Sequence, residues 1–367
     1  MTTLALQNIT KRFKSDTVLD DLSLNVASGE TLVLFGPSGA GKTVLLRLIA
    51  GAIEPDGGKV ILGGADMTDV PPEDRGVGMA FQNFALFPHM SAFDNIASPL
   101  EARRQPTQTI KTGVEKIAGL LKIGHVLNHA PRALSNGQKQ RTALARALAA
   151  EPKLLLLDDP LRNVDAKLRF EMRLELPRLL ADQGATVVYV TQDYKEAMAL
   201  GDRIAVLDGG KISQLGTPSE IYRTPADLTI AQLFGDPTIN LLDVTPEEDA
   251  RGVYVSLSDH RVPIDQGLSH AVGRSCVLGV RPEALSFSDA PDAIPITIEA
   301  ETPLNEKTVT LVITKRGREV LLSRPAEQDA PRSGEAAMRV DTGDVLLFDK
   351  ETGARIVPAN TRKEQAA

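Results

Sequence analysis

The chain has 367 residues, with 41 basic and 48 acidic side chains and a formal net charge of −7 at pH 7. This length allows two to three domains with a sizeable core, and the acidic balance argues against nucleic acid as a partner. The single cysteine excludes an intrachain disulfide. No uncharged apolar run approaches the roughly 18 residues of a membrane-spanning helix, so we expect a soluble protein that can still bind a membrane protein.

Short apolar strands alternate with helical segments over the first two-thirds of the chain. Strands of this kind, separated by helices, indicate a mostly parallel α/β sheet. We expect a helix at Lys42–Ala50 that ends at Gly51. The expected strands are Thr31–Phe35, Leu154–Leu157, Thr186–Val190 and Ile204–Leu207.

Two helical stretches depart from this alternation. Residues 101–132 are polar, helical in pattern and without a strand, which predicts a helical subdomain over about 85–150 inserted into the α/β core. Residues 167–183 are also helical in pattern but contain Pro177. Because proline removes a backbone donor and crowds the preceding turn, we expect a kink or break near 173–176.

The pattern changes after about Gly235, where short alternating runs are separated by turn residues such as Pro-Asp and Thr-Gly. Such runs predict a small all-β domain of barrel type. We therefore expect one domain over 1–235 and a second over 236–367. The runs are 252–257, 275–280, 296–300, 309–314, 319–322 and 345–348.

A glycine-rich motif lies directly between the first predicted strand and the first predicted helix. It fits the phosphate-binding pattern GxxxxGK[ST], whose backbone N–H groups surround phosphate oxygens at a helix N-terminus. Lys42 would reach the β- and γ-phosphates, and Thr43 would ligate Mg²⁺. A chance glycine-rich turn is the alternative, and it would not require a strand and a helix in this order. The motif comprises Gly36, Pro37, Ser38, Gly39, Ala40, Gly41, Lys42 and Thr43.

Two carboxylates follow the four leucines of a later strand. Asp158 would emerge beside the phosphate loop, where it can hold Mg²⁺ through water. Asp159 is then a candidate to orient or deprotonate the attacking water. An ordinary strand that ends in an acidic turn is the simpler alternative, and the phosphate loop upstream disfavours it.

A third motif, Leu134–Gln138, opens a helix. A small polar loop at a helix N-terminus can bind an anion. Taken alone, the motif is explained as well by Ser135 acting as an ordinary N-cap.

In order and spacing, these three motifs resemble those of the ATP-binding-cassette (ABC) ATPases, over about residues 4–234. The resemblance implies an α/β P-loop NTPase core with a helical subdomain, ATP and Mg²⁺ as ligands, and stacking of Phe13 on adenine. It implies that Gln82 senses Mg²⁺ and the attacking water and touches a membrane subunit. Gln192 stands where the family has its switch histidine. Asp165 lies in the loop that crosses to a second ATPase subunit, and the family signature comprises Ser135, Asn136, Gly137 and Gln138.

Four further segments are similar to the ATPase subunits of bacterial carbohydrate importers of the maltose and glycerol-phosphate type. This resemblance implies a C-terminal OB-like regulatory domain of the TOBE type, two integral-membrane permease subunits and a periplasmic solute-binding protein. It also implies a peripheral location on the cytoplasmic face of the cell membrane and a carbohydrate, polyol or glycerol-like solute. The segments are 69–79, 86–90, 216–222 and 280–283.

Three positions depart from the family pattern. Asp159 replaces a glutamate, and its carboxylate is set back by roughly one ångström, a displacement that can cost about 10²-fold in rate. Gln192 replaces the switch histidine; it can donate a hydrogen bond but cannot carry a proton at pH 7. Asn136 replaces a glycine, and asparagine is the least costly substitute if that position needs a positive φ.

The family's dimers are head to tail, with each ATP between the phosphate loop of one chain and the signature of the other. Asp159 and Gln192 would therefore weaken the site on this chain's own phosphate loop, whereas Asn136 would alter the opposite site only mildly. We hypothesise a heterodimer with a second, intact ATPase chain. The alternatives are a slow homodimeric ATPase of the same class and a regulatory nucleotide-binding module with little hydrolysis.

Overall fold

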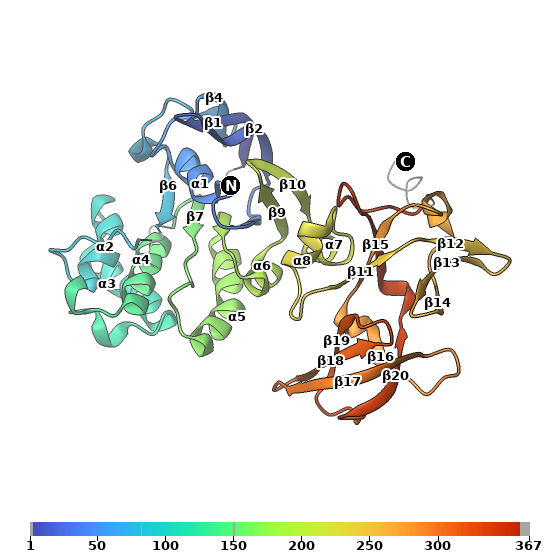
Figure 1. Cartoon of the computed structure of the whole chain (residues 1–367). Helices are drawn as coiled ribbons and strands as arrows, with labels where there is room; N and C mark the ends of the chain where they lie inside the picture. Colours follow the sequence, from blue (N-terminus) through green and yellow to red (C-terminus); the bar gives the residue numbers. More distant parts are fainter. Residues whose placement is uncertain (1–2, 82, 150, 360–367) are drawn as a thin grey trace. The chain divides into compact units, whose positions relative to one another are not determined.

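The computed structural model describes residues 3–81, 83–149 and 151–359. It divides into two compact units, one up to Pro218 and the other from Ser219 on (Figure 1). The boundary predicted at 235/236 therefore falls inside the second unit. The helix α8 (Leu228–Leu233) belongs to the second unit, because its Ala231 is buried in the same apolar cluster as Phe348 near the end of the chain.

A sheet of six strands forms the centre of the first unit within the described ranges. Its order is β10-β9-β3-β8-β7-β6, and all neighbours run parallel except β9 and β10. β7 and β8 are buried along their whole length, as expected for strands covered on both faces, so the predicted parallel α/β sheet is confirmed. The strands are β3 (Thr31–Phe35), β6 (Val77–Ala80), β7 (Leu154–Asp158), β8 (Thr186–Val190), β9 (Arg203–Asp208) and β10 (Lys211–Gly216).

A second, antiparallel sheet covers α1 (Lys42–Ala50), which packs against β7 and β8 with its other side. Leucines of this sheet, of α1 and of the parallel sheet share one core, in which Leu6, Leu45 and Leu34 are fully buried. Figure 1 shows α1 beneath the blue strands. This sheet, whose order is β2-β1-β4-β5, was not predicted from the sequence. Its strands are β1 (Leu4–Phe13), β2 (Asp16–Val26), β4 (Gly57–Leu62) and β5 (Ala65–Asp66).

The helices expected between about 85 and 150 are α2 (Ala92–Ala102), α3 (Thr107–Leu120) and α4 (Asn136–Ala149), which pack on one another. α2 begins with a capping box in which Ser91 and Asp94 satisfy each other's backbone N–H groups. α4 also packs against β6 and β7. This contact connects the helical group to the end of β7, where the two predicted carboxylates lie.

Two further helices of the first unit, α5 (Ala166–Gln183) and α6 (Tyr194–Leu200), pack against each other, and α6 also packs against β3. The break expected near 173–176 is wrong, because α5 runs without interruption through Pro177. An interior proline costs about 3 kcal/mol in helix stability. Burial of Leu176 and Leu180 in the core offsets that cost and keeps the helix whole.

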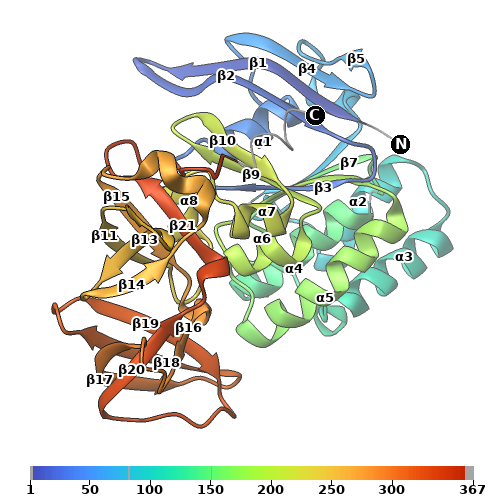
Figure 2. The same cartoon turned by 90° about the vertical axis from the view of Figure 1, so that its right-hand side faces the viewer.

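The second unit is built mainly of strands, as predicted, and they form three small antiparallel sheets among its described residues (Figure 2). Val255, Leu278 and Val312, one from each sheet, lie in a common core. α7 (Pro218–Arg223) begins at the division between the units. The sheets are β11-β15-β21 (Asn240–Val244, Cys276–Val280, Val345–Asp349), β12-β13-β14 (Glu247–Asp249, Gly252–Leu257, His260–Pro263) and β16-β20-β17-β18-β19 (Leu285–Phe287, Gly334–Val340, Ile294–Pro303, Lys307–Thr314, Glu319–Pro325).

Within the described residues, the helices are all too short or too polar to cross a bilayer.

Candidate functional site

The loop between β3 and α1 has the backbone conformation that its glycines permit. Gly36, Gly39 and Gly41 have φ values of 151°, 84° and 100°. A Cβ atom at Gly36 would lie 2.1 Å from the carbonyl oxygen of Leu207, so this position excludes any side chain. The loop therefore turns tightly at the carboxyl end of a central strand and points its last residues into the start of α1, as the phosphate-binding motif predicts.

The Lys42 side chain is held inside this loop. Its Nζ atom donates hydrogen bonds of 2.7 Å to the carbonyl oxygens of Gly36 and Pro37. Only 6% of the residue is exposed. Burial lowers the pKa of Lys42, while the charges of Asp159 and Asp158 act in the opposite direction. The ammonium group is thus a fixed, poorly hydrated cation, which strengthens its attraction for a phosphate.

Thr43 and Asp158 form the part of the site that suits a magnesium ion. Asp158 ends β7, and its Oδ1 atom accepts a 3.2 Å hydrogen bond from Thr43 Oγ1. Burial raises the pKa of Asp158, because its charge is costly away from water; the Thr43 bond, Arg47 and Lys42 lower it. A hydroxyl and a desolvated carboxylate side by side are the hard oxygen ligands that Mg²⁺ prefers, so these residues fit the ion.

The backbone of Asp159 has a strained, left-handed conformation. Its φ of 49° is left-handed, which is uncommon for a residue other than glycine. Its N–H donates to Val190 O at 2.9 Å, and its carbonyl oxygen accepts from Gln140 Nε2 of α4 at 2.7 Å. Backbone strain of this kind persists where the surroundings hold it, often at functional sites.

The Asp159 carboxylate lies at the edge of the site, 3.8 Å from the guanidinium of Arg162. Burial raises the pKa of Asp159, and the charge of Arg162 is the largest influence that lowers it. The arginine side chain is itself 54% exposed, so this ion pair is weakly held. Asp159 therefore combines a buried position with a nearby cation that competes for its oxygens.

Gln192 reaches the phosphate loop from the carboxyl end of β8, which lies beside β3 and runs parallel to it. Its Oε1 atom accepts a 3.3 Å hydrogen bond from Ser38 Oγ. Behind it, the buried Glu196 accepts hydrogen bonds from Tyr189 OH at 2.8 Å and Thr191 Oγ1 at 3.0 Å. Burial raises the pKa of Glu196, and these two bonds lower it. This network fixes the backbone on both sides of Gln192.

Asp193, next to Gln192, is connected to α5. Arg173 Nη2 lies 2.6 Å from its Oδ2 atom, and Arg169 lies 3.8 Å away. Arg169 also donates to the carbonyl oxygens of Arg162 and Val164 in the loop before α5. One arginine therefore spans the loop that carries Asp165 and the loop that carries Gln192.

A cavity of about 450 Å³ joins these groups. Its lining includes Phe13, which is 45% exposed, so its ring is accessible to a flat ligand. Lys11 Nζ lies 5.5 Å from the centre of the same ring. The predicted site residues that line the cavity are Phe13, Ser38, Gly39, Ala40, Gly41, Lys42, Thr43, Asp158, Asp159 and Gln192.

Other predicted residues are not brought to this cavity. Asp165 is the exposed N-cap of α5, where it accepts a 3.0 Å hydrogen bond from Leu168 N. The signature residues 135–138 lie at the start of α4. Gly36 and Pro37 belong to the loop but do not line the cavity. Gln82 lies outside the described residues.

The signature loop has the geometry of an N-terminal cap. Gln138 N donates to Ser135 Oγ at 3.3 Å, and Ser135 N donates to Gln138 Oε1 at 2.9 Å. This reciprocal pair is a capping box, so the N-cap explanation of Ser135 is confirmed. Asn136 is the first residue of α4 and has no positive φ, so the left-handed conformation considered for it is not adopted.

Sequence reasoning missed Gln140, Arg162, Arg169 and Arg173. Gln140 Oε1 accepts from Asn163 N at 2.8 Å while its amide holds Asp159, so it ties α4 to the loop after β7. Nothing in its immediate sequence distinguishes it from other polar helix residues. The three-residue spacing of Asp159 and Arg162 was the one local sign of their contact.

Comparisons with known proteins agree with this site. Residues 19–162 match the family described as ABC transporter, and residues 235–285 match the MalK OB fold domain. The chain is 39% identical to the trehalose/maltose import ATP-binding protein MalK of Thermococcus litoralis, covering 97% of this chain and 100% of the relative. It is equally identical, with the same coverage, to the sn-glycerol-3-phosphate import ATP-binding protein UgpC of Escherichia coli O157:H7.

The first unit is also similar to a solved structure, the dimeric ATP-binding cassette MJ0796 in a post-hydrolysis state with ADP and Pi. The two share 30% sequence identity and a TM-score of 0.55. The match covers 59% of this chain and 98% of the cassette.

Proposed function

The chain belongs to the family of ABC transporter ATP-binding subunits, and from this premise we propose that it drives import of a carbohydrate, polyol or glycerol-like solute. As a member of the family it is an ATPase that uses ATP with Mg²⁺. The solute class is supported by two relatives of full length, whose names give trehalose/maltose and sn-glycerol 3-phosphate as their imports.

The binding of ATP follows from the chemistry of the phosphate loop. Lys42 would donate to the β- and γ-phosphate oxygens, and the exposed ring of Phe13 would stack on the adenine. Thr43 and Asp158 would hold Mg²⁺, which offsets phosphate charge when it is bound. Asp159 and Gln192 would then flank the γ-phosphate, the first toward the attacking water and the second toward a phosphate oxygen.

We further propose that this chain is the less active member of a heterodimeric ATPase pair. The observation that carries the proposal is Asp159, whose carboxylate is one methylene shorter than that of a glutamate and lies 3.8 Å from Arg162. A carboxylate that is set back by about one ångström orients and deprotonates the attacking water poorly. Gln192 cannot take up a proton at the other side of the site.

The proposed assembly contains two membrane permease subunits, a second ATPase chain and a periplasmic solute-binding protein. The chain would lie against the permeases at the cytoplasmic face of the membrane. Each ATP would lie between the phosphate loop of one ATPase chain and the signature of the other. The signature residues 135–138 stand apart from the cavity in this chain, which supports a role in the partner's site.

Two alternatives make different predictions. A slow homodimer would turn over ATP through Asp159 itself. A regulatory module would bind ATP and hydrolyse almost none. Both alternatives keep the same phosphate loop, so a measurement of nucleotide binding does not distinguish them from the heterodimer. The identity of the second ATPase chain and the chain responsible for ATP turnover distinguish the three.

The deciding experiment is to purify the membrane complex through a tag on this chain and to identify its ATPase subunits by mass. We expect a second cassette chain with an intact glutamate and histidine. Replacing that partner's glutamate by glutamine should remove most of the turnover, whereas Asp159→Asn in this chain should remove little. Two copies of this chain alone would overturn the heterodimer, and loss of turnover on Asp159→Asn would then identify Asp159 as the base.

A further inference from the structure

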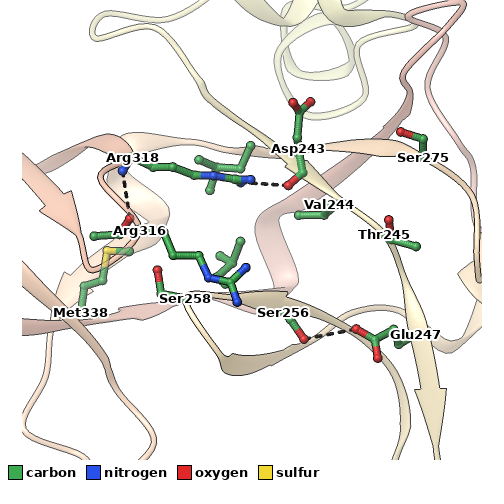
Figure 3. A pocket seen from close by; sticks show the side chains of 13 residues that line it. Asp243, Val244, Thr245, Glu247, Ser256, Ser258, Ser275, Arg316, Arg318 and Met338 are labelled. Carbon is green, nitrogen blue, oxygen red and sulfur yellow. Dashed lines mark hydrogen bonds between the residues drawn. The ribbon is translucent and has the colours of Figure 1, made fainter.

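The second unit contains a cavity of about 280 Å³, and its lining includes none of the residues assigned to the nucleotide site. Three sheets meet at it (Figure 3). β11 contributes Asp243 and Val244, the β13–β14 hairpin contributes Ser256 and Ser258, and the turn between β18 and β19 contributes arginines. A ligand in this position would touch elements of all three sheets, which also share one apolar core.

Arg318 lies over one side of the cavity and is held there. Its Nη1 atom donates to the carbonyl oxygen of Asp243 at 2.8 Å, and its backbone N–H donates to Thr314 Oγ1 at 3.2 Å. The Asp243 carboxylate is engaged elsewhere, 2.9 Å from Lys350 Nζ. Among the described residues, none accepts a hydrogen bond from Arg318 Nη2. The guanidinium is therefore oriented, with a donor still available to a ligand.

Arg316 supplies a second cation on the same side. Figure 3 shows its guanidinium directed between Ser258 and Ser256. It forms an ion pair with Asp259, but both side chains are mostly exposed, at 57% and 78%. An exposed pair of this kind is worth at most about 1 kcal/mol, so a ligand with a double negative charge can displace it.

The hairpin turn at the cavity is strained. Ser258 and Asp259 have φ values of 49° and 68°, in a two-residue connection where Asn-Gly is preferred. Ser258 is 8% exposed and lines the cavity. Two consecutive left-handed residues other than glycine are costly; here they place Ser258 in the cavity lining and the Asp259 carboxylate against Arg316.

The opposite wall offers hydrogen-bond acceptors. The carboxylate of Glu247 accepts from Ser256 Oγ at 3.3 Å and from Tyr254 OH at 3.1 Å. Figure 3 shows Glu247 and Ser256 facing each other on the side away from Arg318. An ionised carboxylate has acceptor sites beyond these two bonds, and the hydroxyl groups of a polyol are natural donors to it.

We infer that this cavity is a binding site for a small phosphorylated polyol. The phosphate would lie between Arg316 and Arg318, whose planar forks match phosphate oxygens. The hydroxyl end would lie toward Glu247 and Ser256. The cavity volume is just below the usual range for small-molecule sites of about 300 to 1,000 Å³, which favours a ligand of a few carbons over a nucleotide. Bound there, it would join three sheets and make the second unit a sensor of a phosphorylated metabolite.

The test is a calorimetric titration of the full chain with sn-glycerol 3-phosphate, in saturating Mg²⁺ and a non-hydrolysable ATP analogue that fills the phosphate loop. We expect one binding event per chain with a dissociation constant between about 10 μM and 1 mM. Arg318→Gln and Arg316→Gln should each weaken it at least about tenfold. Arg251→Gln is the matched control, because it removes the same charge from an exposed side chain outside the cavity.

Three outcomes would overturn the inference. One is no binding at about 10 mM ligand. Another is binding that survives both arginine substitutions. The third is equal affinity for inorganic phosphate or for glycerol alone, since the site requires both ends of the ligand. The measurement uses this chain alone, so its result does not depend on the solute imported or on the identity of the second ATPase subunit.

Discussion

The half of the nucleotide site that holds phosphate and metal differs from the half that would activate water. Lys42 and Asp158 are buried; Lys42 Nζ donates to two loop carbonyl oxygens at 2.7 Å, and Thr43 Oγ1 donates to Asp158 at 3.2 Å. Asp159 has a left-handed backbone, and Gln192 contacts Ser38 at 3.3 Å; we propose that both depart from the family's catalytic residue types. With the roles proposed above, nucleotide binding and water activation depend on different side chains, so the second can weaken while the first is retained.

The largest expected effect is in the binding half. Lys42→Ala removes a desolvated cation from the centre of the loop, so we expect ATP affinity to fall by about 100-fold or more, as for a charge-assisted hydrogen bond with two partners. Calorimetric titration with a non-hydrolysable ATP analogue measures it. Lys59→Ala, at an exposed lysine of β4, is the control and should leave affinity unchanged. Unchanged affinity in Lys42→Ala would contradict the binding geometry described here.

We expect a gain of ATPase activity when the two residues proposed to act on the attacking water and the γ-phosphate are replaced by the types usual in the family. In the complex whose partner chain carries the glutamate-to-glutamine change, Asp159→Glu combined with Gln192→His should raise ATP turnover by roughly 10- to 100-fold, because it moves a carboxylate forward by about one ångström and adds a group that can carry a proton. ATP affinity should change little. Steady-state phosphate release measures the effect.

The matched control for that variant is Asp208→Glu, the same lengthening at the exposed end of β9. Turnover that stays at the parent level in the double variant would mean that neither residue limits hydrolysis. The structural difference between the phosphate-binding and water-activating halves of the site would then have no effect on ATP hydrolysis.

The smallest expected effect is on folding stability and concerns Glu196, whose hydrogen bonds lie behind Gln192. Burial raises the pKa of Glu196, so the folded state favours its protonated form. Glu196 therefore stabilises the folded state most at pH values below its pKa in the unfolded chain. This stabilisation is lost as the pH rises through its pKa in the folded protein. Glu196→Gln cannot ionise and keeps an oxygen for Tyr189 and Thr191.

Thermal unfolding of Glu196→Gln at about pH 5 and about pH 8 checks this expectation. Relative to the parent, the melting temperature of the variant should be higher at the upper pH than at the lower one. Glu175→Gln on α5 serves as a control for loss of a carboxylate that is exposed. A difference of the opposite sign would show that Glu196 is stabilised as an anion.

The parts of the molecule that were predicted correctly depend on residues close in the chain. The loop at 36–43 needs only a strand, its own glycines and a helix start, so its sequence is sufficient to identify it. The alternating runs of the second unit likewise match its strands, with β13 found at 252–257 as expected. Local conformational preference and side-chain periodicity act over a few residues, and both are visible in a sequence.

The features that were missed depend on contacts between distant residues. Nothing near Pro177 indicates that buried leucines would keep α5 whole, and nothing near Gln140 indicates that it would hold Asp159. The same is true of Arg173 with Asp193 and of the arginines at the cavity of the second unit. The residue types of the nucleotide site were therefore readable from the chain alone. Their support, strain and competing ion pairs arise only when packing brings remote segments within hydrogen-bond distance.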